Sequence, residues 1–347
     1  MGGWRLVNGS CWRLFWRRGK GINPLKGKVC AYLSLKDDVR VAVRTGSVNA
    51  GHTVTYNGVE YKLRMIPCGF VNPNTTLCIA AGANIRIDVL MREIELTKTK
   101  NRLKIDPQAS IIEDEHVKRE REDAYLISKI GSTGQGVGAA IVDRVRRVAK
   151  LARDVKELEE YLDDVLMILW NAYQQGHNIL LEGTQGYYLS LYHGTYPYVT
   201  SRDTTASAIC SEVGIGPKMV DEVIVVLKSY VTRVGEGPLP GELSEEEAER
   251  RGLIEIATVT GRRRRVAPFN FDLAKRAVLA NSATQIALTR IDTLFPTASR
   301  IRDYDKLPRE AKKFIEDVED ALKVPVTVIS TGPDVFDTID LREVKGP

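Results

Sequence analysis

Several features that would assign a chain to a special class are missing from this sequence. No run of 18 apolar residues occurs, so we expect no helix that spans a membrane and no membrane partner. The five cysteines are odd in number and scattered, without the spacing of metal ligands, which fits free thiols in a reducing cytoplasm. The four histidines are scattered as well, which argues against a histidine-based metal centre.

Acidic residues are absent from the first 36 positions, which hold eight Lys or Arg and three of the four tryptophans. The whole chain has a net charge of +5, so the other 311 residues carry −3. This balance argues against a general nucleic-acid binder, because such proteins present a basic surface. A basic start without acids is typical of a transit peptide or of a nucleic-acid-binding arm. It lacks the apolar core of a signal peptide.

Alternating or fully apolar runs predict strands over residues 39–43, 61–66, 76–80, 178–181, 223–227, 284–288 and 325–329. Amphipathic stretches between them predict helices over residues 85–96, 113–127, 155–175, 271–281 and 308–322. Strands that alternate with helices indicate an α/β fold with a largely parallel sheet. Since no internal repeat or low-complexity linker interrupts the chain, we expect a single domain.

The longest stretch without periodicity is residues 182–205, which follows a predicted buried strand. Such a long loop is uncommon in a compact domain unless it has a function. In α/β proteins, ligands bind where strands end at their carboxyl edge. Gly183 and Gly186 let the backbone approach a ligand, and Gln185 and Thr200 offer hydrogen-bonding groups. The alternative is a polar surface loop.

Three further segments carry chemistry. Residues 131–138 hold four glycines, whose backbone N–H groups can form a concave nest for a phosphate, although the Lys-Ser/Thr ending of a Walker A loop is missing. Four adjacent arginines, 262–265, repel one another unless anions neutralise them, and they suit carboxylate or phosphate; a solvated run or a localisation signal is the alternative. His52 follows a predicted strand and is either a catalyst or a structural hydrogen-bonding group.

Five motifs occur in a set order: Asn49-Ala-Gly-His-Thr53, Glu182-Gly-Thr-Gln-Gly186, His193-Gly-Thr-Tyr-Pro-Tyr-Val-Thr200, Thr260-Gly-Arg-Arg-Arg-Arg265 and Ser330-Thr-Gly-Pro333. Together they closely resemble the adenylosuccinate synthetase family, in a compact form like those of archaea. The resemblance runs from about residue 26 to the C-terminus. It implies a P-loop-NTPase-like, largely parallel sheet flanked by helices, and a homodimer. It also implies a ligase of purine biosynthesis that makes adenylosuccinate from IMP and L-aspartate, with GTP as co-substrate and Mg²⁺ as cofactor.

The resemblance also assigns residues to roles. His52 is implied as the catalytic residue, and the carbonyl of Gly51 as a Mg²⁺ ligand. The residues implied for IMP are Asn49, Ala50, Gly51, His52, Thr133, Gln185, Thr200 and Arg262, with Arg147 reaching in from the partner subunit. Those implied for aspartate are Thr258, Val259, Thr260, Gly261, Arg262, Arg263 and Arg264. Those implied for GTP are Gly51, His52, Thr53, Arg264, Arg290, Ile291, Asp292, Ser330, Thr331 and Gly332.

The start of the chain departs from the family, which opens with a strand and then Gly-Asp-Glu-Gly-Lys-Gly-Lys. The Asp of that motif is the general base on IMP and a Mg²⁺ ligand. This chain has no Asp or Glu before Asp37, and only Lys26-Gly-Lys28 matches the motif directly before Val29. We therefore divide the chain into residues 1–28, an aberrant segment that replaces the expected first strand and phosphate loop, and residues 29–347, the synthetase-like domain. We predict that residues 1 to about 25 are a frame-shifted reading, and that the chain as written is a poor enzyme.

A smaller departure is Arg290, where the family usually has Lys along the base. Asp292, just past a predicted strand, can accept hydrogen bonds from guanine N1–H and N2–H. Two other functions stay open from the sequence. One is a catalytically inactive relative that binds purine nucleotides, and the other is an RNA-binding protein that uses its basic start and the arginine run. The acidic body of the chain favours a protein without a nucleic-acid partner.

Overall fold

Parallel strands joined by helices form the centre of the molecule. The computed structural model describes residues 4–9, 26–49, 51–255 and 263–346, the first of these ranges by its backbone. Within them a nine-stranded sheet has all neighbouring strands parallel except the pair at one edge. From that edge the strands are β15 (Thr338–Asp340), β14 (Val326–Ser330), β13 (Gln285–Thr289), β10 (Glu222–Lys228), β1 (Trp4–Gly9), β9 (Ile179–Glu182), β2 (Val41–Arg44), β5 (Thr76–Ile79) and β7 (Leu103–Ile105).

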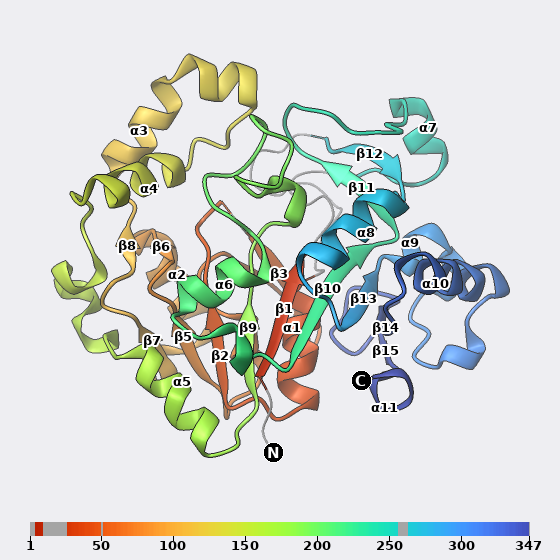
Figure 1. Cartoon of the computed structure of the whole chain (residues 1–347), viewed down its shortest axis with the longest axis horizontal. Coiled ribbons are helices and arrows are strands. Elements are labelled where there is room, and N and C mark those ends of the chain that lie inside the picture. Colours follow the sequence, from red (N-terminus) through yellow and green to blue (C-terminus); the bar gives the residue numbers. More distant parts are fainter. Residues whose placement is uncertain (1–3, 10–25, 50, 256–262, 347) are drawn as a thin grey trace.

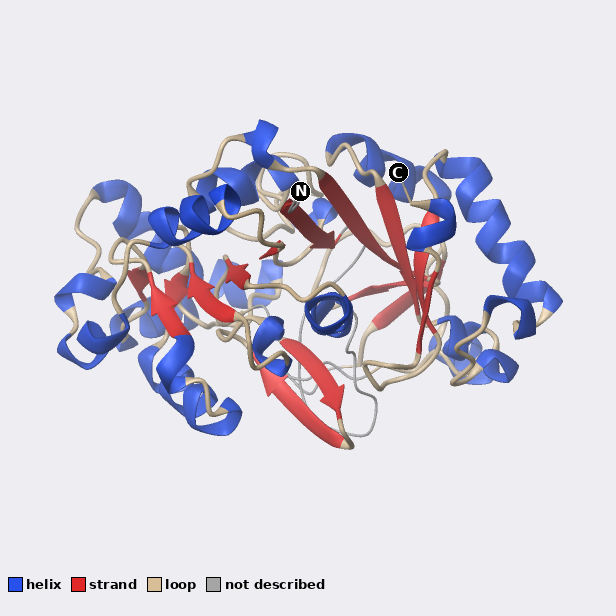
Figure 2. Ribbon diagram, turned by 90° about the horizontal axis from the view of Figure 1, so that it is seen from below, coloured by secondary structure: helices blue, strands red, loops and turns tan. Residues whose placement is uncertain are grey.

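Helices cover both faces of this sheet (Figures 1 and 2). They are α1 (Lys26–Lys36), α2 (Ile87–Thr97), α3 (Asp114–Glu122), α4 (Val137–Arg146), α5 (Val165–Gln174), α6 (Ala206–Val213), α7 (Glu245–Arg250), α8 (Phe271–Ala280), α9 (Ile291–Leu294), α10 (Arg309–Leu322) and α11 (Arg342–Lys345). Three small sheets lie outside the central one. They pair β3 (His52–Tyr56) with β4 (Val59–Leu63), β6 (Asn84–Ile85) with β8 (Ser110–Ile111), and β11 (Tyr230–Arg233) with β12 (Arg265–Pro268).

Each central strand feeds two hydrophobic cores, because successive side chains of a strand point to opposite faces. In β10, Val223, Val225 and Leu227 pack into one core with residues of α5, α6, α8 and α10. Ile224 and Val226 pack into the other core with residues of α1 and α2. Burial on both faces explains why this strand reads as an unbroken apolar run. The prediction of an α/β fold with a largely parallel sheet is confirmed.

Three predicted elements differ from the structure. The helix predicted over residues 113–127 is divided into α3, which ends at Glu122, and a π-helical turn at Tyr125–Ile130. The helix predicted over residues 155–175 is divided, with a 3₁₀ turn at Lys156–Tyr161 and α5 from Val165 onward. Asp164 stops the first part, because its side chain caps α5 by accepting a hydrogen bond from Met167 N. The strand predicted over residues 61–66 lies earlier and forms a hairpin, β3–β4, beside the main sheet.

The first described residues form the middle strand of the sheet. β1 pairs in parallel with both β9 and β10, and Leu6 lies opposite Leu181 and Val223. The expectation that residues 1–28 lack the first strand is therefore wrong for Trp4–Gly9. The predicted loss of the phosphate loop falls on residues 10–25, outside the described residues. Among the described helices, none has the length and apolar character needed to cross a membrane.

Candidate functional site

The predicted site residues lie where neighbouring parallel strands end. Asn49 follows β2, Gln185 follows β9, Asp292 follows β13, and Ser330–Gly332 run from the last residue of β14 into the next turn. Because the carboxyl ends of parallel strands share one edge of a sheet, all four loops lie along the same edge. They form two groups there: Asn49 and Gln185 follow the neighbouring strands β2 and β9, and Asp292 and Ser330–Gly332 follow the neighbouring strands β13 and β14, with β10 and β1 in between.

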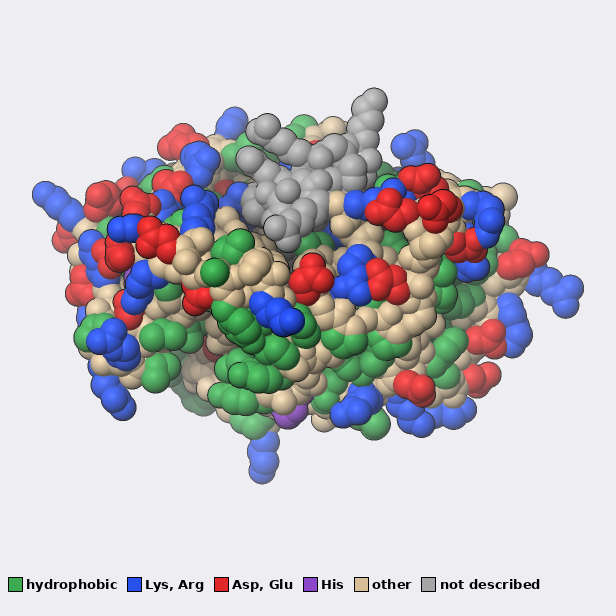
Figure 3. Space-filling model, turned by 90° about the horizontal axis from the view of Figure 1, so that it is seen from above, with side chains coloured by type: hydrophobic (Ala, Val, Ile, Leu, Met, Phe, Trp, Pro, Cys, Tyr) green, Lys and Arg blue, Asp and Glu red, His purple; other side chains and the backbone are tan. Residues whose placement is uncertain are grey.

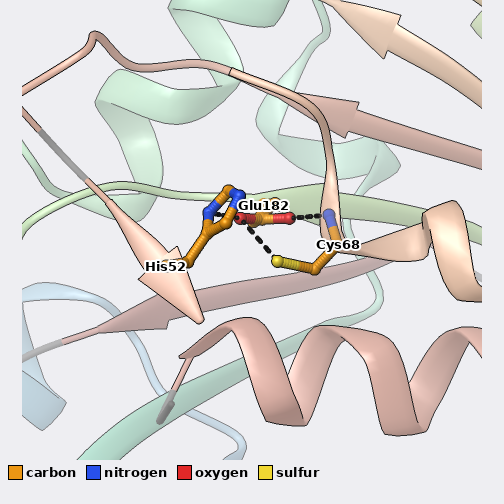
Figure 4. A group of neighbouring side chains, drawn as sticks. All are labelled: His52, Cys68 and Glu182. Atoms are coloured by element: carbon orange, nitrogen blue, oxygen red, sulfur yellow. Dashed lines mark hydrogen bonds and ion pairs between the residues drawn. The ribbon is translucent and has the colours of Figure 1, made fainter. Parts of the chain in front are cut away.

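His52 and Glu182 form a buried polar pair at this edge, and their side chains point toward one another (Figure 4). His52 Nδ1 lies 2.8 Å from Glu182 Oε1, and His52 Nε2 lies 2.9 Å from the carbonyl oxygen of Ile66. Glu182 also accepts hydrogen bonds from Arg44 Nη1, at 2.5 Å, and from the backbone N–H of Cys68, at 2.7 Å. The Glu182 carboxylate therefore lies between the catalytic candidate His52 and the buried guanidinium of Arg44 and contacts both.

The charges of this pair follow from its surroundings. Burial would raise the pKa of Glu182, but His52, Arg44 and the Cys68 N–H outweigh burial and lower the pKa to about 2. Burial, followed by the charge of Arg44, lowers the pKa of His52 against the opposing effect of Glu182. Glu182 is therefore charged, whereas His52 experiences opposing effects: burial and Arg44 favour the neutral ring, and Glu182 and the Ile66 carbonyl favour the protonated one. A neutral ring has one N–H, so the Ile66 carbonyl and the carboxylate compete for it.

Ligand atoms of His52, Cys68 and Glu182 lie within 4.8 Å of one another, as in a metal site. One observation argues against a resident ion, because Arg44 already neutralises the carboxylate. Burial raises the pKa of the Cys68 thiol well above its usual value, so the thiol is the form next to Glu182. A thiol and an imidazole are also not the oxygen ligands that Mg²⁺ prefers. We read the group as a positioning cluster for His52.

Four of the residues assigned to IMP lie together. Gln185 Nε2 donates to Thr200 Oγ1 at 3.0 Å and to Asn49 Oδ1 at 3.3 Å. Asn49, Thr133 and Thr200 line one cavity of about 150 Å³. Gln185 is buried, and its Oε1 atom has no hydrogen-bond partner among the described residues. A buried acceptor without a partner is costly, so this atom is suited to a donor from a ligand.

The glycine-rich loop does form an anion nest, but the protein fills it itself. Glu120 of α3 accepts hydrogen bonds from the N–H groups of Gly136 at 2.7 Å and Gly138 at 2.6 Å, at the start of α4. Gly136 has φ 77, and a Cβ atom there would lie 2.8 Å from Val117 N, so the position requires glycine. The interpretation of these N–H groups as a phosphate nest is therefore wrong, whereas Thr133 in the same loop does line the cavity.

Internal carboxylates also neutralise the described members of the arginine run. Arg263 pairs with Glu249 of α7 at 2.8 Å, and Arg265 pairs with Glu242. Arg264 is buried beside Glu255, at 3.3 Å. The sequence predicted that anions neutralise these arginines, and in the structure carboxylates of the protein itself do so. The other residues assigned to aspartate, Thr258–Arg262, lie outside the described residues, as does Ala50 of the IMP set.

The residues assigned to the guanine base lie at the ends of β13 and β14, which are neighbours in the sheet. Burial raises the pKa of Asp292, against the opposing charges of Arg290 and Lys28. Lys28 lies under this region, where its ammonium group donates to Ser330 Oγ at 2.8 Å and to the carbonyl oxygen of Gly332 at 2.7 Å. Two other residues assigned to GTP are buried here: Thr331, which lies between Ser330 and Gly332 in the sequence, and Ile291 at the start of α9.

Arg147 is the assigned residue that stands apart from this edge. It is the exposed C-cap residue of α4, with φ 66, and it does not line the cavity. Sequence reasoning also missed functional candidates. Lys26 donates to the carbonyl oxygen of Gln185, and Lys28 reaches the guanine side, so the first turn of α1 contacts both halves of the site. A signal for Glu182 was available, because a carboxylate that ends a fully buried strand needs cationic partners.

Comparisons with known proteins agree with this geometry. Residues 25–157 and 146–298 match the family model described as adenylosuccinate synthetase. The adenylosuccinate synthetase of Thermococcus onnurineus is 51% identical over 322 residues, which cover 92% of this chain and 95% of the relative. That of Methanocaldococcus jannaschii is 51% identical over 321 residues, which cover 91% of this chain and 93% of the relative.

Two solved structures share the fold. The fully ligated adenylosuccinate synthetase from Plasmodium falciparum has a TM-score of 0.87 at 24% identity, covering 98% of this chain and 100% of that chain. The succinoaminodeoxyadenylate synthetase of cyanophage S-2L, bound to dGMP and dATP, has a TM-score of 0.80 at 25% identity, covering 98% and 96%. With relatives at about half identity over nearly the whole length, the chain belongs to the adenylosuccinate synthetase family.

Proposed function

We propose that this chain joins L-aspartate to IMP with GTP, giving adenylosuccinate, GDP and phosphate. The observation that carries the proposal is that Asn49 and Thr200 line one cavity and that the buried Gln185 donates hydrogen bonds to both of them. The family membership supplies the reaction. The scattered cysteines that the structure describes are free and buried, which supports our placing the protein in a reducing cytoplasm.

Two displacements make up the proposed reaction. O6 of IMP, after loss of the N1 proton, attacks the γ-phosphorus of GTP, and the bond to the bridging oxygen breaks to release GDP. The amine of aspartate then attacks C6, the C6–O6 bond breaks, phosphate leaves, and the extra amine proton passes to phosphate or solvent. Glu182 would fix the ring of His52 through Nδ1, and Nε2–H would exchange the Ile66 carbonyl for the phosphoryl oxygen as charge develops there.

Mg²⁺ belongs to this proposal because the chain offers one suitable ligand. The carbonyl oxygen of Gly51, directly before His52, is a hard oxygen donor, and Mg²⁺ commonly takes only one or two protein ligands besides phosphate oxygens and water. When bound, the ion would neutralise charge on the transferred phosphoryl group. The carboxylate ligand of the family motif has no counterpart before Asp37.

A homodimer with shared sites is the second part of the proposal. Arg147 is exposed at the end of α4, as a residue donated to a partner must be. Val142, Val145 and Val148 lie beside it on the same segment, and each is more than half exposed. Exposed apolar side chains at this spacing mark a surface that a partner covers. We propose that a second copy of the chain covers it.

Two other functions are weaker. An RNA-binding protein would present a basic stripe, whereas basic and acidic side chains are interspersed over the described part of the face in Figure 3. An inactive purine-nucleotide-binding relative is favoured by one observation, the absence of Asp and Glu before position 37. Such a relative would bind the same nucleotides as the enzyme but would not form adenylosuccinate.

The binding half of the proposal is tested by calorimetry with IMP. We expect the wild-type chain to bind IMP and the Gln185→Leu chain to bind it at least tenfold more weakly, about the effect of losing a buried hydrogen bond. The exposed Gln174 at the end of α5 provides a matched control, because Gln174→Leu removes the same amide away from the cavity. Absence of IMP binding to the folded wild-type chain would contradict the proposal. Formation of adenylosuccinate then separates the enzyme from the inactive relative.

A further inference from the structure

Glu255 is a buried carboxylate to which the proposed reaction assigns no role. It is 3% exposed and lies directly before the segment 256–262. Both of its oxygens accept hydrogen bonds from Lys228 Nζ at 2.8 Å, and Tyr230 donates its hydroxyl to Oε1. Lys228 ends β10 and Tyr230 begins β11, so these contacts tie Glu255 to the central sheet.

Two arginines complete the surroundings of this carboxylate. Arg264 Nη1 lies 3.3 Å from Oε2, and the backbone N–H of Arg264 donates to the carbonyl oxygen of Glu255 at 2.7 Å. Arg290 Nε lies 3.8 Å from Oε1. Arg264 and Arg290 come from different elements, the start of β12 and the end of β13, and Glu255 is the carboxylate that faces both.

The cluster has more positive than negative charge. Three cations, Lys228, Arg264 and Arg290, surround the buried carboxylate of Glu255, and the carboxyl group of Asp292 also faces Arg290. Burial would raise the pKa of Glu255, but these cations outweigh burial and hold the pKa far below its usual value. The neighbouring segment 256–262 contains no Asp or Glu, so it adds no carboxylate. Buried cations in excess favour an incoming anion, and arginine binds phosphate and carboxylate groups in a defined orientation.

We propose that Glu255 is a positioning residue that orients Arg264 toward the anionic part of GTP and Arg290 toward its base, with Lys228 and Tyr230 holding its carboxylate in place. This inference rests on the proposed function, because that function supplies the nucleotide. Three cations against the carboxyl groups of Glu255 and Asp292 leave the cluster with an excess of positive charge, which favours a further anion. A glutamine keeps the size of the side chain, but it has no charge and only one acceptor oxygen. It therefore cannot hold Lys228, Arg264 and Arg290 in their positions.

The test compares binding of GTP and of IMP by calorimetry in the full-length chain. In Glu255→Gln we expect GTP affinity to fall at least tenfold, about the loss of one charge-assisted hydrogen bond, with IMP affinity within twofold of wild type. Tyr230→Phe removes one hydrogen bond to the carboxylate and keeps every charge, so we expect a smaller loss for GTP. Glu249→Gln is the matched control, because it makes the same change beside Arg263 in an exposed pair, and it should change neither affinity.

The outcomes separate this inference from the proposed function. Unchanged GTP affinity in a folded Glu255→Gln chain would overturn the inference while the proposed function stands. Equal losses of GTP and IMP affinity would also overturn it, because they indicate a general structural role. If Glu255→Gln does not fold, the double variant Glu255→Gln/Lys228→Met, which removes one charge of each sign, and Tyr230→Phe provide the same comparison. A wild-type chain that binds neither nucleotide overturns both proposals.

Discussion

The imidazole of His52 lies against the carboxylate of Glu182, with Nδ1 2.8 Å from Oε1 and both side chains buried. Arg44 and the Cys68 N–H bind the same carboxylate, so its position is fixed from three sides. His52 belongs to a hairpin beside the sheet, whereas Glu182 ends a central strand. The pair therefore ties a catalytic candidate to the central sheet.

The first prediction concerns Glu182→Gln. Without the carboxylate, the His52 ring loses its fixed orientation, so we expect kcat to fall by about 10², the range of a positioned proton-transfer group, with little change in KM. The negative charge of Glu182 raises the pKa of His52, so its removal should move the pH-rate limb that reports His52 to lower pH. Initial rates between pH 5 and 9 measure both effects. The control is Glu319→Gln on α10, which makes the same change in an ion pair with Lys345 of α11. A rise in KM with unchanged kcat would contradict the positioning role.

The second prediction concerns the choice of base. Asp292 can accept two hydrogen bonds from guanine, and adenine has no matching donors at those positions. Asp292→Asn replaces one acceptor by a donor, so we expect the preference for GTP over ATP to fall at least tenfold. Competition binding of the two nucleotides measures the ratio, and Asp317→Asn on the exposed side of α10 should leave it unchanged. Equal binding of GTP and ATP by the wild-type chain would contradict this assignment.

A third prediction follows from the exposed position of Arg147. If each site takes Arg147 from the partner, mixing Arg147→Leu chains with His52→Asn chains should restore about a quarter of wild-type activity, since half of the dimers are hybrids with one intact site. Arg146→Leu changes the neighbouring exposed arginine and should keep its activity without mixing. No recovery, despite proven exchange of subunits, would indicate that each site is complete within one chain.

Much of this architecture could be predicted from the sequence because central strands leave a clear signal. Residues 223–227 are apolar without interruption, since β10 is buried on both faces. Helix stops were harder to place, as Asp164 shows, because a polar residue inside an apolar pattern reads as a surface position until its capping bond is seen. β1 was missed because Trp4–Gly9 follows no regular pattern, and its pairing partners lie far along the chain.

The candidate site also has a part that could be predicted from the sequence and a part that could not. Its loops could be predicted, because parallel strands deliver their carboxyl ends to one edge. Its internal counter-ions could not, because Glu120 and Glu255 look like ordinary surface residues in the sequence. Each binds a group that the sequence offered to a ligand, the glycine-rich N–H groups in one case and Arg264 in the other. An excess of donors in a sequence therefore shows where anions bind, but not whether the anion is a ligand.

The fourth prediction concerns Lys28 and pH. Burial lowers its pKa from 10.5 to about 7, although Asp337 and Asp292 oppose this effect. Between about pH 7 and 10 the unfolded chain keeps this proton and the folded chain has lost it, so the free energy of unfolding should rise with pH by up to about 1.4 kcal/mol per unit. Urea unfolding of wild type and Lys28→Met should show this slope in wild type alone. Lys36→Met, on the last turn of the same helix, is the control. Parallel pH profiles for wild type and Lys28→Met would contradict it.

The last prediction concerns the missing base. α1 begins at Lys26, and Lys26-Gly-Lys28 already occupies the end of the family motif, so four substitutions restore it: Ile22→Gly, Asn23→Asp, Pro24→Glu and Leu25→Gly. A general base contributes about 10² to 10⁴ in rate, so we expect adenylosuccinate formation to rise by at least 10² over the chain as written. The matched control carries the three other changes and keeps Asn23, so it restores the backbone of the motif without its carboxylate. If the two variants turn over equally, or if the chain as written works at ordinary enzymatic rates, the absence of the aspartate does not limit catalysis.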